Sequence, residues 1–194
     1  MKALTLFTTF ILFSCSAVKQ QNDLIIALER DIIKEYCKIV PAHAQDIIMY
    51  PEEITICTIS EEKSYDKQTK VWGYSATSKL YRIQGATADK LKQIILDPMS
   101  NDRIKMNYEK RKSSIIQNNE DLPNEFWVKE CLFKPGFAIR FKDGENFTDC
   151  LICLGCNQWQ FVYESIDFDL GDIDSVKEDL KGILRQAFPT HKSL

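Results

Sequence analysis

The stretch FAIRFKDGENFTDCLICLGCNQWQFVY, residues 137–163, decides the fold because apolar side chains recur at every second position through three successive runs. Phe137 opens the first run, residues 147–154 form the second, and Trp159 lies in the third. Asp143–Gly144 and residues 155–157 separate the runs and carry residues that favour turns. A period of two is typical of strands, and short turns join antiparallel neighbours. The stretch therefore predicts an antiparallel meander with one aromatic face.

Outward from the meander, the chain alternates between strand-like and helix-like patterns. Apolar residues at helical spacing predict a helix over 23–38, with Asp23 as its N-cap. Strands are expected over 54–59, 71–74 and 80–83. A helix capped by Thr87 should follow Gly85 and stop at Asp97–Pro98, and the capping-box residues Ser175 and Glu178 should open a last helix that ends before Pro189. The fold class expected is α+β: an antiparallel meander sheet packed by two or three helices, in a single domain.

A polar stretch at about residues 99–124 interrupts these elements and is expected to be a surface excursion. It carries a basic run: Arg103, Lys105, Lys110, Arg111 and Lys112. Such a run can bind phosphate or an acidic partner through its charge, although a solvated loop is the simpler interpretation. We therefore keep it as a candidate partner-binding loop.

The N-terminus carries the pattern of an export signal. Lys2 precedes an apolar run over residues 3–13, which is shorter than the roughly 20 residues that span a bilayer. Residues 12–15, Leu-Phe-Ser-Cys, resemble the lipobox of bacterial lipoproteins, although Phe13 is bulkier than the residue usual there. The resemblance implies a signal peptide over residues 1–14 and a lipid on Cys15.

Further expectations follow from this resemblance. Residues 15–22 would form a short tether, and 23–190 a single domain. Ser16 is not the aspartate that retains enterobacterial lipoproteins in the inner membrane. The resemblance thus implies an outer-membrane lipoprotein of the cell envelope, with its domain in the periplasm or at the cell surface.

Size and charge agree with one exported domain. The chain has 194 residues, and the part after residue 14 is long enough to bury one core. Its 25 basic and 28 acidic residues give a net charge of −3, which offers no general attraction to nucleic acid. A nucleic-acid partner is therefore not expected.

Six cysteines remain besides Cys15, at positions 37, 57, 131, 150, 153 and 156. A strand rises about 3.3 Å per residue and alternates faces, so Cys150 and Cys153 would lie about 10 Å apart on opposite faces. Cys153 and Cys156 can approach each other only if residues 154–157 fold as a turn. Residues 131–189 also resemble small bacterial proteins of unknown function that combine Cys-x-x-Pro with Ile-Cys-x-x-Cys, a resemblance that brings no activity with it.

Three interpretations of this cluster stay open. The first is a disulfide between Cys131 and either Cys153 or Cys156, with the other cysteines buried as small apolar residues. The second is zinc held by Cys131, Cys153 and Cys156, although a fourth ligand is missing at any recognisable spacing. The third is thiol redox chemistry, which usually places Cys-x-x-Cys at a helix start rather than before a strand.

The sequence lacks the motifs of common enzymes. It has neither Gly-x-Ser-x-Gly nor His-Glu-x-x-His, and its seven glycines form no phosphate-cradling pattern. The favoured hypothesis is a non-enzymatic, lipid-anchored binding module with an envelope protein as partner and without a cofactor. The alternative is a metal or thiol protein that uses the cysteine cluster.

Overall fold

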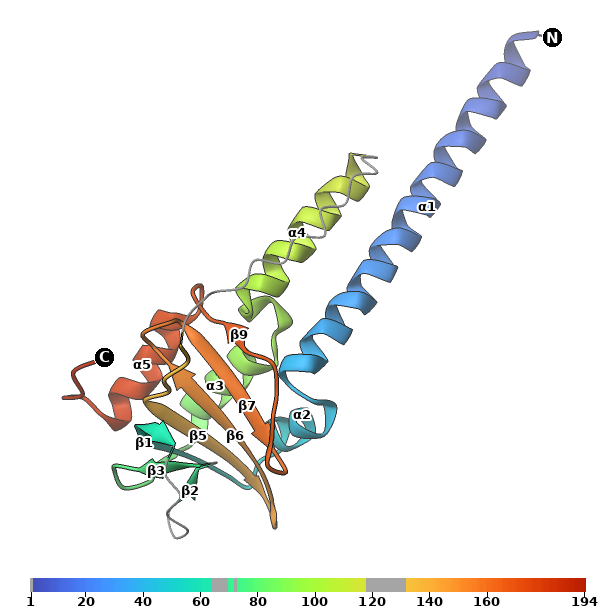
Figure 1. Cartoon of the computed structure of the whole chain (residues 1–194). Coiled ribbons are helices and arrows are strands. Elements are labelled where there is room, and N and C mark those ends of the chain that lie inside the picture. Colours follow the sequence, from blue (N-terminus) through green and yellow to red (C-terminus); the bar gives the residue numbers. More distant parts are fainter. Residues whose placement is uncertain (1, 64–69, 72, 118–131) are drawn as a thin grey trace.

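The computed structural model describes residues 2–63, 70–71, 73–117 and 132–194, and gives only the backbone of 2–18, 61–63 and 70–71. A curled antiparallel sheet has helices on one face, and two long helices extend away from it (Figure 1). The helices are α1 (Lys2–Ile39), α2 (Ala42–Met49), α3 (Gly85–Leu96), the 3-10 turn η1 (Pro98–Ser100), α4 (Asp102–Ile116) and α5 (Lys177–Ala187). This arrangement is the single-domain α+β fold that the sequence predicts.

The sheet follows the order β2-β3-β1-β5-β6-β7-β8, with β4 paired to β1 and β9 paired to β7. Its strands are β1 (Glu53–Lys63), β2 (Lys70–Val71), β3 (Tyr74–Ala76), β4 (Tyr81–Ile83), β5 (Phe137–Asp143), β6 (Asn146–Cys153), β7 (Gln158–Tyr163), β8 (Ile166–Asp167) and β9 (Gly171–Asp172). The predicted meander is confirmed as β5–β6–β7. The pairs Ile139–Cys150 and Cys150–Phe161 set its register.

The core lies between the meander and the helices. Phe137, Phe141, Trp159 and Phe161 are fully buried on the sheet face that α2, α3, α5 and the end of α1 cover. The predicted aromatic face is therefore the core face. Burial of a large apolar side chain contributes about 1.5–3 kcal/mol, so these aromatic residues are a main source of stability.

The stretch expected as an irregular excursion is largely helical, which corrects the prediction for residues 99–117. Asn101 caps α4, since its side chain accepts a hydrogen bond from the Ile104 amide at 3.2 Å. Ile104 is buried, and Tyr108 and Ile115 are partly buried against the core cluster. These apolar residues are few and are separated by polar ones. The helical face that they form can be recognised only when the neighbouring helix that covers it is known. Residues 118–124 lie outside the described residues.

Several expected helix starts are also wrong. Asp23 lies inside α1, and Thr87 lies inside α3, whose N-cap is Gln84. Helix α5 begins at Lys177, and the amide of Ser175 donates to Asp102 at the base of α4. Helix α2, which follows Pro41, was not predicted.

None of the described helices combines the length and apolar character needed to cross a membrane.

Candidate functional site

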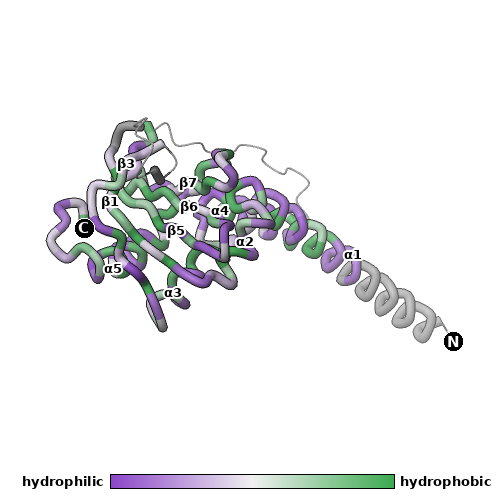
Figure 2. Tube along the Cα trace, turned by 90° about the horizontal axis from the view of Figure 1, so that it is seen from below, coloured by the Kyte–Doolittle hydropathy of each residue, from purple (hydrophilic) through white to green (hydrophobic). Residues whose placement is uncertain are grey.

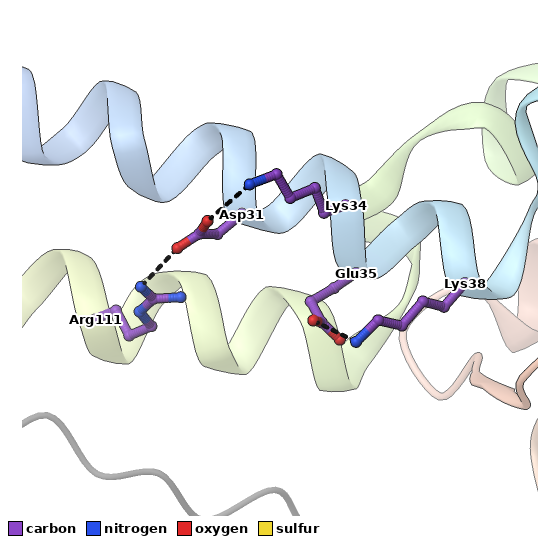
Figure 3. Close-up of polar contacts among 5 residues, drawn as sticks. All are labelled: Asp31, Lys34, Glu35, Lys38 and Arg111. Atoms are coloured by element: carbon purple, nitrogen blue, oxygen red, sulfur yellow. Dashed lines mark hydrogen bonds and ion pairs between the residues drawn. The ribbon is translucent and has the colours of Figure 1, made fainter.

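Two regions hold the residues that the sequence singles out. The first is the arm, defined as residues 19–39 of α1 together with α4. In Figure 1, α1 runs toward the sheet and α4 runs away from it, so the two helices are antiparallel neighbours. Arg111 Nη2 donates to Asp31 Oδ2 at 3.1 Å across the pair, as Figure 3 shows. This contact joins residues that are 80 positions apart.

The five basic residues that the sequence singles out all lie on α4, but they make different contacts. Arg111 pairs with Asp31, and Lys112 lies over the Tyr108 ring at 5.2 Å from its centroid. Arg111 therefore links α4 to α1, whereas the contact of Lys112 with Tyr108 lies within α4. The other three face solvent wholly or partly: Arg103, Lys105 and Lys110. The basic run is thus a helix surface rather than a loop.

The arm also leaves large apolar side chains in contact with solvent. Ile33 of α1 is 56 % exposed, and Met106 of α4 is 57 % exposed. The others on the arm are Leu24, Ile26 and Ile116. Hydrophobic and hydrophilic segments accordingly alternate along α1 and α4 in Figure 2. The arm therefore exposes both apolar and charged side chains.

The second region is the cysteine turn, residues 153–157, which joins β6 to β7. Cys153 is the last residue of β6, and Asn157 adopts the left-handed conformation with φ of 54°. The Sγ atoms of Cys153 and Cys156 lie 2.6 Å apart, and the Cys156 amide donates to Cys153 Sγ at 3.4 Å. Both side chains are buried, whereas Gly155 between them is exposed. The turn that the sequence required for this approach is therefore present.

Two hydrogen bonds, one between side chains and one between backbone groups, hold the cysteine turn against the segment before α5. The Asn157 side chain donates to Asp174 at 2.6 Å, and the Ile173 amide donates to the Asn157 carbonyl at 2.9 Å. The positive φ of Asn157 is a conformation that asparagine tolerates better than most residues. These contacts fix the turn at its C-terminal end, directly after Cys156.

The other candidate cysteines lie elsewhere. Cys150 is fully buried on the helix-covered face, where burial raises the pKa of its thiol well above the ordinary value. Cys57 lies on the opposite face, and burial raises the pKa of its thiol to about 11. Cys131 lies outside the described residues, and only the backbone of Cys15 is described. The structure thus brings Cys153 and Cys156 together and separates them from Cys150 by the sheet.

The sulfur pair fits a zinc site poorly. Two thiolates on a tetrahedral zinc, at about 2.3 Å each, would lie roughly 3.8 Å apart. The observed separation is 2.6 Å, and the described residues contain no group of three or more His, Cys, Asp or Glu side chains placed to hold a metal ion. Zinc binding with Cys131 as the third ligand stays a prediction, since that residue is not described.

Sequence reasoning missed a buried ion pair on the face opposite the helices. Arg140 of β5 donates two hydrogen bonds of 2.7 Å to Asp149 of β6, and its guanidinium lies over the Phe147 ring at 4.1 Å. Asp149 is 1 % exposed, so burial raises the pKa of its carboxyl while the Arg140 guanidinium opposes that shift. The polar positions of the two strands signal this pair only after their register is known.

The arm offers charge and exposed apolar surface, whereas the cysteine turn offers thiol chemistry. Both regions are built from residues that the sequence flags, but only the structure assigns each residue to a surface or to the core. No protein-family model, curated protein or solved structure matches this chain.

Proposed function

We propose that this protein is a lipid-anchored envelope protein that binds a protein partner through the arm. The observation that carries the proposal is the set of exposed apolar side chains on α1 and α4 together with the basic side chains of α4, typified by Ile33, Met106 and Lys110. Exposed apolar side chains gathered on paired helices are characteristic of docking surfaces. The absence of a recognisable enzyme motif is consistent with a binding role, but it carries no weight by itself.

The proposed lipid on Cys15 gives the arm a defined position relative to the membrane. Helix α1 is continuous through residue 15 to Ile39, and at about 1.5 Å per residue this part is about 36 Å long. A lipid at its outer end would hold the sheet and core away from the membrane surface. The arm would then occupy the space between the membrane and the body, where an envelope protein can reach it.

The partner's chemistry follows from the arm. Lys110 is exposed, and Arg103 and Lys105 are partly exposed, so the partner surface should be acidic. Met106 and Ile116 are each more than half exposed and require apolar contacts. We therefore expect an envelope protein with acidic residues around an apolar groove, bound to a helix pair.

Site-specific photocrosslinking in intact cells tests the partner. A photoreactive residue at Met106 or Lys110 should give one crosslinked product of defined mass. The same residue at Glu145, which is exposed on the β5–β6 turn, is the matched control and should give none. Equal labelling at all three positions, or crosslinks to lipid alone, would contradict the proposal.

The anchor is tested separately. Metabolic labelling with an alkyne analogue of palmitate should mark the wild-type chain and the Cys37→Ser variant. The Cys15→Ser variant should lose the label and leave the membrane fraction. An unlabelled wild-type chain would remove the anchor from the proposal and leave the arm to be judged by crosslinking.

A further inference from the structure

The cysteine turn holds two sulfur atoms closer than non-bonded atoms normally lie. The Sγ atoms of Cys153 and Cys156 are 2.6 Å apart, whereas a disulfide bond measures about 2.05 Å. A zinc-bound pair would be farther apart, at roughly 3.8 Å. The spacing therefore resembles a dithiol poised to bond more than a pair of metal ligands.

Hydrogen bonds around the turn keep this geometry in place. The Cys156 amide donates to Cys153 Sγ, and Asn157 is tied to Asp174 and Ile173. Little backbone rearrangement is needed for the two sulfurs to bond. Pre-organisation of this kind removes most of the entropic cost of closing a loop.

We propose that Cys153 and Cys156 form a reversible disulfide within the β6–β7 turn. This pairing differs from the Cys131 disulfide expected from the sequence, and it does not depend on the arm or on its partner. The proposal assigns a redox modification to the cysteine turn, which plays no part in the proposed binding function.

The oxidant is a disulfide, of a small molecule or of a protein. One cysteine thiolate attacks a sulfur of that disulfide, so that a mixed disulfide forms and one thiol leaves. The second cysteine then attacks the mixed disulfide, the Cys153–Cys156 bond forms, and the second thiol leaves. Two electrons and two protons pass from the two cysteines to the oxidant, which becomes two thiols.

Cys57 and Cys150 are poor candidates for this exchange chemistry. Cys57 and Cys150 are buried on opposite faces of the sheet, and burial raises the pKa of both thiols. Both therefore stay protonated and are poor nucleophiles near neutral pH. The turn is also the place where an exposed glycine, Gly155, adjoins the sulfur pair.

The test equilibrates the full, reduced chain with glutathione mixtures of increasing oxidised fraction and then alkylates it with N-ethylmaleimide in denaturant. Intact mass should show the loss of two adducts in one two-electron transition. Trypsin should release residues 143–177, which hold Cys150, Cys153 and Cys156. Fragmentation of this peptide should fail between residues 153 and 156 only, and this measurement needs no variant.

Variants identify the pair independently. Cys153→Ser and Cys156→Ser should keep all their adducts, whereas Cys37→Ser, the matched control, should lose two as the wild type does. If the loss persists in Cys156→Ser or in Cys153→Ser and vanishes in Cys131→Ser, the disulfide involves Cys131 and the proposal is wrong. Protection of both cysteines by one bound zinc ion per chain would also overturn it.

Discussion

At the scale of single residues, Gly171 of β9 shows how closely the core is packed. A Cβ atom at this position would lie 2.1 Å from Trp159 Nε1 and 2.6 Å from Asn101 Nδ2. Both neighbours are fully buried, so neither can move without disturbing the core. Gly171→Ala should therefore destabilise the protein by about 1–3 kcal/mol, as overpacking generally does. Urea unfolding followed by circular dichroism measures this difference.

The matched control for that prediction is Gly182→Ala in α5. A Cβ atom at Gly182 would meet no atom within 4 Å, and the position is inside a helix. Alanine is the better helix former, so this variant should gain about 0.5–1 kcal/mol. If both alanine variants shift the free energy of unfolding in the same direction, a clash with Trp159 does not determine the effect of Gly171→Ala.

A second residue-scale prediction concerns alkaline pH. Burial raises the pKa of Cys57 from 9.0 to about 11 in the folded chain. Between these values the unfolded chain loses its thiol proton while the folded chain keeps it, so stability falls as pH rises from 9 to 11. The contribution is about 3 kcal/mol, since each pKa unit corresponds to about 1.4 kcal/mol. Cys57→Ala should flatten this part of the stability curve, and an unchanged slope in that variant would contradict the assignment.

At the scale of elements, the sequence predicts best where a pattern is complete within one segment. The strands β5, β6 and β7 alternate every two residues and are joined by short turns, so their pairing follows from residues 137–163 alone. The sequence makes the approach of Cys153 to Cys156 conditional on a turn over residues 154–157, and the structure supplies that turn. Helix α4 was missed because its apolar face is sparse and is completed by α1, whose Asp31 lies 80 positions away. No local pattern reports such a contact.

Two neighbouring cations of the arm, Arg111 and Lys110, should differ in their effect on how firmly α4 is held. Arg111 pairs with Asp31 across the helices, and both side chains are partly exposed, so the pair contributes at most about 1 kcal/mol. Arg111→Ala should loosen α4 and speed amide hydrogen exchange there. Lys110→Ala, the matched control, should leave exchange unchanged and weaken only partner binding. Equal exchange in both variants would show that apolar contacts alone hold α4 on α1.

At the scale of the whole molecule, α1 serves the core as well as the proposed anchor. Leu28, Ile32 and Tyr36 are each less than 5 % exposed, and the Tyr36 hydroxyl donates to the Ile95 carbonyl of α3. The same helix continues outward through the position of the proposed lipid, residue 15. Residues 15–22, the proposed tether, are thus helical and continuous with an element of the core. A pull on the proposed anchor would act directly on the fold.

This continuity predicts how far the chain can be shortened. A chain that begins at Lys19 keeps Leu28, Ile32 and Tyr36 and should unfold cooperatively in urea, near the wild-type midpoint. A chain that begins at Cys37 loses all three, at about 1.5–3 kcal/mol each, from a total stability of about 5–15 kcal/mol. It should lack a cooperative transition and bind a hydrophobic dye. If the shorter chain instead unfolds cooperatively with a wild-type slope, α1 is an appendage, and the body behind it is the independent folding unit.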